Sequence, residues 1–137
     1  MSKRQKRWIN SRPKPIQPQV PESTKLEVSK AAGNLVETFL KPKYVQPPPE
    51  DEQFNYIVDI YTKWYRNYFY FCTKYACPGP NAISPSFESK FARMAYVGDG
   101  QFHLSFMRYT GEWIELYHGL LLDECLKAIQ EEPYFQP

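Results

Sequence analysis

Three residues near the end of the sequence could together cleave a phosphodiester. His103, Arg108 and Glu115 would supply an acid, a phosphate-binding cation and a base, as in a small nuclease or toxin-type enzyme. Alternation along the predicted strands, however, places Arg93 and Arg108 on the face opposite His103 and Glu115. The sequence also has no phosphate-binding glycine loop and no Ser–His or Cys–His spacing typical of hydrolases. Catalysis is therefore the alternative, and a non-enzymatic role is the main expectation.

The spacing between two of the cysteines is at the limit of the range seen in structural zinc sites. Cys72 and Cys77 are five positions apart, but no second close pair of ligands follows, and Cys125 falls on the apolar stripe of a predicted helix. We expect packed free thiols and no cofactor, with Cys72 and Cys77 as the alternative metal ligands. Free thiols are typical of a reducing compartment, and the sequence shows no membrane span or secretory signal. A cytoplasmic protein without a membrane partner is therefore expected.

The positive charge of the chain is concentrated at its start. The net charge is only +2, yet residues 1–25 carry +6 and residues 26–137 carry −4. A flexible cationic arm would release counterions from a phosphate backbone, and a tryptophan within it could stack on a base. A solvated tail and a nuclear-import signal are the alternatives. The candidate docking residues of the arm are Lys3, Arg4, Lys6, Arg7, Trp8, Arg12 and Lys14.

Aromatic residues are more numerous than one small core requires. Ten of the 22 residues from Phe54 to Tyr75 are aromatic, so some rings should lie outside the core. They could form a stacking platform for bases or for a partner protein. The alternative is that helices cover both sheet faces and the tyrosines lie at the edge of the core. The candidate platform residues are Tyr68, Tyr70, Tyr109, Trp113 and Tyr117.

The elements that must position these side chains follow from hydrophobic periodicity. Residues 1–22 are rich in proline and predict an arm that is disordered or ordered by a partner, and residues 23–137 predict one domain. The 3.6-residue period predicts a helix over 25–40, capped by Thr24 and ended by Pro42. A period of two then predicts strands over 54–64, 68–75, 90–97, 101–109 and 113–118, and the last helix covers 121–131.

Short turns between successive strands predict a meander. The fold class is therefore α+β, with an N-terminal helix, a five-stranded antiparallel meander and a C-terminal helix. Pairing Tyr109 with Trp113 would put Ile114 and Leu116 on the apolar face with Leu104. Tyr117 would then lie on the opposite face.

The stretch from Phe102 to Tyr117 resembles a family of small bacterial domains of unknown function. It combines an aromatic-x-Leu strand and Arg108 with Gly111-x-Trp113 and a tyrosine four residues further on. The resemblance covers residues 26–137. It implies the α+β meander, and it carries no established activity or catalytic residue.

These observations predict an interaction module. The basic arm would dock to an anionic macromolecule, RNA or a ribonucleoprotein, and the aromatic sheet face or the loop 77–85 would supply a second contact. The alternatives are the small nuclease described above and a structural subunit of a larger protein assembly. The sequence leaves the oligomeric state open.

Overall fold

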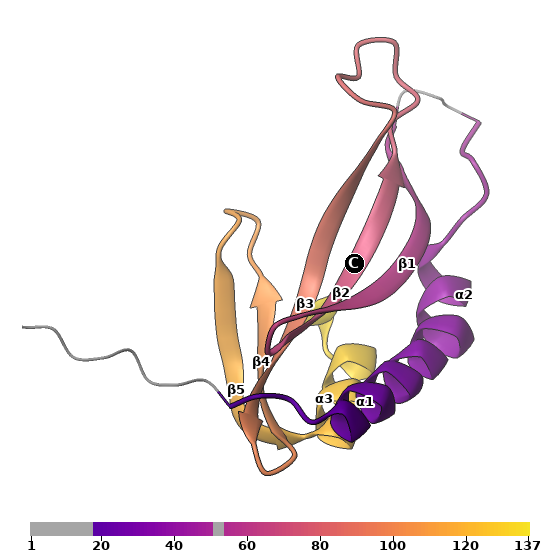
Figure 1. Cartoon of the computed structure of the whole chain (residues 1–137). Helices are drawn as coiled ribbons and strands as arrows, with labels where there is room; N and C mark the ends of the chain where they lie inside the picture. Colours follow the sequence, from indigo (N-terminus) through magenta and orange to yellow (C-terminus); the bar gives the residue numbers. More distant parts are fainter. Residues whose placement is uncertain (1–17, 51–53) are drawn as a thin grey trace, which may run out of the picture.

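The sheet of this protein is formed by strands that pair in the order in which they occur in the sequence (Figure 1). A computed structural model describes residues 18–50 and 54–137. Its strands are β1 (Tyr56–Tyr65), β2 (Tyr68–Ala76), β3 (Ser86–Gly98), β4 (Gln101–Met107) and β5 (Trp113–Leu121). All neighbours are antiparallel, so the predicted α+β fold with a five-stranded meander and a helix at each end is confirmed.

The N-terminal helical segment continues past its predicted end. It consists of α1 (Glu22–Leu35), the π-helical turn η1 (Val36–Leu40) and α2 (Lys41–Tyr44). A proline ring clashes with the carbonyl group four residues before it in an α-helix. In η1 the Lys41 N–H donates to the Val36 carbonyl oxygen five residues back, and this wider turn gives the Pro42 ring room. The predicted stop at Pro42 is therefore wrong. The predicted cap is also wrong, because the helix begins at Glu22 and Thr24 lies inside it.

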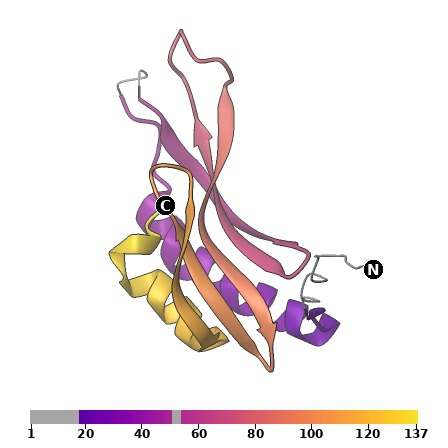
Figure 2. The ribbon, with the colours of Figure 1, turned by 90° about the vertical axis from the view of Figure 1, so that its left-hand side faces the viewer.

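Both helical segments cover the same face of the sheet. Helix α1 contacts β1 and α3 (Leu122–Glu131), and α3 contacts β4 and β5. Figure 2 looks onto the strands with the helices behind them. The alternative in which the two helices cover both faces is therefore wrong, and the helices of the described residues leave one face of the sheet uncovered.

The core lies between the helices and the covered face of the sheet. Side chains at helical spacing in the two segments meet alternate residues of all the central strands, and a 3₁₀ turn, η2 (Pro133–Phe135), closes the core. The fully buried large side chains are Phe69, Phe71, Phe102, Phe135, Leu40, Ile60, Met94, Leu104 and Val28. The Trp64 indole N–H donates to the Lys25 carbonyl oxygen at 3.3 Å and ties β1 to α1.

Register shifts occur in all four strand pairs, and two of them overturn predicted placements on the uncovered face. The β3–β4 register shifts by one residue between Tyr96 and Gly98, so Arg93 pairs with Ser105 instead of Phe106. The β4–β5 register shifts at Leu116, so Tyr117 pairs with Leu104. A one-residue shift inverts the face of every following side chain. The predicted placements of Arg93 and Tyr117 are both wrong for this reason.

The register at the β4–β5 turn also differs from the prediction. Met107, not Tyr109, pairs with Trp113, and the Arg108 N–H donates to the Glu112 carbonyl oxygen across the turn at 2.9 Å. The pairing is displaced by two residues, which preserves the predicted facing of Ile114 and Phe106.

We expect Leu40→Ala to lower the free energy of unfolding by about 2–5 kcal/mol, because Leu40 is fully buried between η1 and the sheet. Chemical denaturation followed by circular dichroism measures this change. Leu26→Ala, on the same helical segment and 71% exposed, is the matched control and should change stability by no more than about 0.5 kcal/mol. Equal losses in the two variants would contradict this packing.

Candidate functional site

The uncovered face of the sheet, called the open face here, gathers aromatic and charged side chains. One cross-strand row runs through all five strands from Lys63 through Tyr70, Arg93 and Ser105 to Glu115. Neighbouring residues in each strand point to the helices instead, as the row from Phe69 through Met94 to Leu104 does. The register also places on the open face Asp59, Tyr61, Tyr65, Tyr68, Cys72, Lys74, Glu88, Lys90, Ala95, His103, Met107 and Trp113.

The guanidinium group of Arg93 is the centre of an aromatic cluster. Its central carbon lies 4.8 Å from the ring centroid of Tyr68 and 4.9 Å from that of Trp113. The ring centroids of Trp113 on β5 and Tyr70 on β2 lie 5.8 Å apart above β3 and β4, and the Lys90 ammonium lies 5.6 Å from the Tyr70 ring. Rings of this kind attract cations by their quadrupole and hold a planar guanidinium in one orientation.

Two buried polar atoms beside this cluster have no hydrogen-bond partner among the described residues. They are Arg93 Nε and Ser105 Oγ, which belong to paired residues of β3 and β4. Ser105 itself is fully buried. In the described part of the chain, moreover, no carboxylate forms an ion pair with Arg93. Arg93 is thus a positioned cation whose charge the described fold leaves unneutralised.

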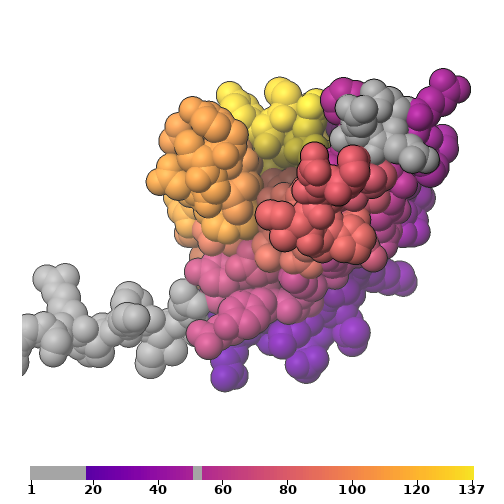
Figure 3. Space-filling view, turned by 90° about the horizontal axis from the view of Figure 1, so that it is seen from above, coloured from indigo at the N-terminus to yellow at the C-terminus, as the bar shows by residue number. Residues whose placement is uncertain are grey.

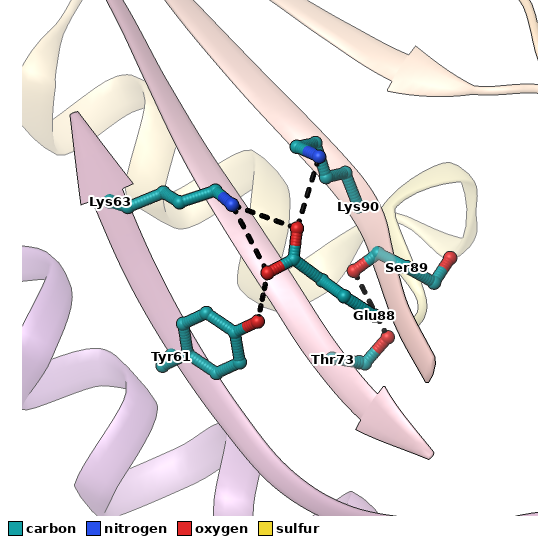
Figure 4. A network of polar contacts seen from close by, with 6 residues as sticks. All are labelled: Tyr61, Lys63, Thr73, Glu88, Ser89 and Lys90. Atoms are coloured by element: carbon teal, nitrogen blue, oxygen red, sulfur yellow. Dashed lines mark hydrogen bonds and ion pairs between the residues drawn. The ribbon is translucent and has the colours of Figure 1, made fainter. Parts of the chain in front are cut away.

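A second polar cluster joins β1 to β3 across β2 (Figure 4). Glu88 accepts hydrogen bonds from Lys63 Nζ at 2.8 and 3.1 Å, from the Tyr61 hydroxyl group, and from Lys90 Nζ at 3.1 Å. The bonds from Lys63 and Tyr61 lower the pKa of Glu88 to about 2. Burial and the hydrogen bond to Glu88 raise the pKa of Tyr61, so the hydroxyl keeps its proton and donates.

Cys72 lies fully buried on the open face, opposite Tyr61 and Lys90 in the register. Burial, assisted by the nearby Glu88, raises the pKa of its thiol to about 11, which disfavours the thiolate that a metal would need. Cys77 follows β2 at the start of the 77–85 loop. Within residues 18–50 and 54–137, no three Cys, His, Asp or Glu side chains gather as metal ligands would. The geometry therefore gives the alternative metal pair no support.

The candidate catalytic residues are only partly brought together. His103 Nδ1 accepts the Gly119 N–H at 3.1 Å, and its ring lies 4.7 Å from that of His118, which bonds to Glu115 at 2.8 Å. Arg108 lies beyond the other end of β4, about 17 Å away at the usual rise of a strand. It pairs instead with Glu112 at 3.8 Å. A His–Glu pair thus forms, but Arg108 cannot act as its phosphate clamp.

The predicted platform residues divide into three groups. Tyr68, Tyr70 and Trp113 meet on the open face. Tyr109 is 95% exposed at the β4–β5 turn, away from them. Tyr117 packs against the core, and its hydroxyl donates to Glu132 at 2.6 Å, which raises the pKa of Tyr117. The predicted arm residues from Lys3 to Lys14 lie outside the described residues.

A groove adjoins the open face where the two hairpins separate. Residues 86–90 of β3 pair with β2 but not with β4, whose last partner is Ala92. Figure 3 shows the resulting hollow between the orange β4–β5 turn and the red 77–85 loop. The groove has a volume of about 500 Å³ and is lined by Lys90, Arg108 and Tyr109 among others. A smaller pocket of about 350 Å³ lies beside Tyr70, between Lys63 and Lys90.

The sequence interpretation missed Arg93, Lys63 and Lys90 as members of this site. The sequence does indicate that Arg93 faces away from the core, because the apolar residues Ala92, Met94 and Tyr96 occupy alternate positions around it. The signal for the two lysines was weaker, since exposed lysines are common on any strand. Their meeting with Tyr70 depends on the pairing of β1, β2 and β3.

The fold and this face define a two-layer α+β domain with a meander sheet, helices on one side and an aromatic, cationic surface on the other. The chain belongs to a family described as a domain of unknown function, DUF3024, whose family model matches residues 20–137. The predicted membership of such a family is thereby confirmed. Searches of the curated proteins and of the solved structures found no match. No helix in the described part of the chain is long and apolar enough to cross a membrane.

We expect Glu88→Gln to destabilise the protein by about 1 kcal/mol at pH 7, as loss of a partly exposed ion-pair network does. Because the folded state lowers the pKa of Glu88 below its ordinary 4.5, the stabilisation is present above pH 4.5 and is lost as the pH falls toward 2. Denaturant titrations at pH 7 and pH 2.5 should therefore show a difference between the two proteins that shrinks in acid.

The control for this experiment is Glu112→Gln, which removes a carboxylate that is 67% exposed and 3.8 Å from Arg108. It should shift stability by less than about 0.5 kcal/mol at either pH. A Glu88→Gln difference that stayed constant between pH 7 and pH 2.5 would show that Glu88 is not held as a carboxylate by its neighbours.

Proposed function

We propose that this protein is a non-enzymatic module that binds single-stranded nucleic acid, with RNA or a ribonucleoprotein as its partner. The observation that carries the proposal is the open face, where the rings of Tyr68, Tyr70 and Trp113 lie among the cations Lys63, Lys90 and Arg93. Proteins that bind single strands combine aromatic rings, on which bases stack, with positive charge that follows the backbone.

The arrangement of charge on the open face supports this ligand class. The register places four cations (Lys63, Lys74, Lys90 and Arg93) and three carboxylates there. All three carboxylates are engaged: Glu88 by Lys63, Lys90 and Tyr61, Glu115 by His118, and Asp59 by Lys41. The phosphates of a strand would therefore meet a face of net positive potential. The pocket of about 350 Å³ beside Tyr70 is of a size that could receive one base.

The basic arm supplies the remaining affinity in this proposal. Its cations would neutralise further phosphates without reading the sequence, while the rings on the sheet hold the bases. The body of the protein is acidic outside the open face, with a charge of −4 over residues 26–137, so the two positive surfaces would orient the strand. A cytoplasmic location is part of this proposal and is supported by three free thiols.

We expect Tyr70→Leu to weaken binding of a short single-stranded oligouridylate about tenfold, because a stacked base contributes about 1–3 kcal/mol. Fluorescence anisotropy with a labelled strand measures this change. Tyr134→Leu is the matched control, since Tyr134 is 55% exposed on the helix side, where it contacts Phe106, and it should leave affinity unchanged. Unmeasurable binding by the parent protein would refute nucleic-acid binding and favour a protein assembly as the partner.

Removing residues 1–17 should reduce the salt dependence of binding. The deletion takes away six cations and leaves Val20, which packs against the core. The slope of log affinity against log salt should fall by about 4, given about 0.7 per neutralised phosphate of a single strand. A full-length control with the six cations changed to glutamine should behave as the deletion does. An unchanged slope would exclude the arm from phosphate contact.

A further inference from the structure

We propose that Arg93 is a receptor for an oxyanion, and that a phosphate group of the bound strand is its ligand. This inference deepens the proposed function and rests on it for the source of the phosphate. The evidence is the position of the guanidinium group, the absence of a counter-ion within the described residues, and two unpaired polar atoms, its own Nε and the neighbouring Ser105 Oγ.

The aromatic contacts fix Arg93 without satisfying its hydrogen bonds. Its guanidinium carbon lies within 5 Å of two ring centroids, those of Tyr68 and Trp113. Contact with rings stabilises the charge and orients the plane of the group, but the five N–H donors of an arginine lie at the edge of that plane. A guanidinium held in this way is oriented in advance to donate to a planar pair of oxygens.

The carboxylates that lie nearest to Arg93 in the strand register bond to other residues. Glu115 pairs with Ser105, the cross-strand partner of Arg93, yet its carboxylate bonds to His118 at 2.8 Å. Glu88 lies on the same strand as Arg93 and bonds to Lys63, Lys90 and Tyr61. Within the described residues, the fold thus leaves the guanidinium group of Arg93 without a carboxylate partner and free for an external anion.

The unsatisfied atoms match the chemistry of an oxyanion. Arg93 Nε–H is a donor, and the Ser105 hydroxyl group can donate as well. The oxygens of a phosphate group in a nucleic-acid strand accept hydrogen bonds and do not donate them. One such phosphate would therefore accept a hydrogen bond from Arg93 Nε–H and another from the Ser105 hydroxyl group. A buried donor without a partner costs stability, and a ligand that supplies acceptors recovers that cost on binding. The two atoms are shielded from solvent in this structure, so binding must displace the Trp113 ring, while the contact with Tyr68 keeps the guanidinium group oriented.

The displacement can be observed in the full-length protein by NMR. Titration with inorganic phosphate, and separately with a short oligouridylate, should shift the Arg93 Nε–Hε and Trp113 indole resonances saturably. The corresponding Arg66 resonance is the internal control, because its guanidinium also lies against a ring, that of Tyr65, but at the exposed β1–β2 turn. It should shift much less than that of Arg93.

Arg93→Lys keeps the charge but removes the planar donor edge. We expect it to weaken oligouridylate binding about tenfold, in the range of a lost charge-assisted bidentate contact, whereas Arg66→Lys should change it less than about twofold. Circular dichroism establishes that each variant is folded, and the titration of the parent protein needs no variant at all.

The outcomes separate this inference from the proposed function. A saturable Arg93 shift with phosphate but no binding of oligouridylate would support the oxyanion receptor and refute nucleic-acid binding. Strand binding with an unmoved Arg93 resonance, or with equal losses in the two lysine variants, would overturn the receptor and leave nucleic-acid binding standing. No Arg93 response to either probe would overturn the receptor as well.

Discussion

Burial of one sheet face beneath two helical segments is the constraint on which this structure depends. The meander has five strands, and within residues 18–50 and 54–137 the helices precede and follow it. Both pack on the same side, where Phe69, Phe71 and Leu104 meet Val28, Leu40 and Ile129 in one core. Because both helical segments place their apolar side chains on the same side of the sheet, one continuous core forms there. Burial of apolar area is the main favourable term in folding. The other face must then be stable against water.

The open face meets that requirement with amphipathic side chains. Tyrosine, tryptophan, lysine and arginine each have an apolar part that covers the strands and a polar part that stays hydrated. The cluster around Glu88 adds specific order, because three donors from β1 and β3 converge on one carboxylate above β2. The same physical solution that protects the face from water gives it rings and cations, which are the groups that bind bases and phosphates. Stability and the proposed function therefore draw on the same residues.

Irregularities of the backbone have large consequences in so small a fold. The π-helical turn η1 lets the first helix continue through Pro42, which extends the helical cover by a turn to Tyr44. The bulge near Val97 moves Arg93 to the open face, and the bulge at Leu116 moves Tyr117 to the core. Each irregularity adds one residue to a periodic pattern, and each therefore inverts or extends a whole surface.

The sequence by itself determined the order and type of the elements, because hydrophobic periodicity depends only on nearby residues. It placed the last helix within one residue of its observed start and named Tyr68, Tyr70 and Trp113, together with Tyr109 and Tyr117, as candidates for an aromatic surface. Only the tertiary structure decided that both helices share one face, that Arg93 lies among those rings, and that Arg108 is remote from His103. These features depend on strand register and on packing between distant segments, whereas periodicity along one strand shows only which residues of that strand share a face.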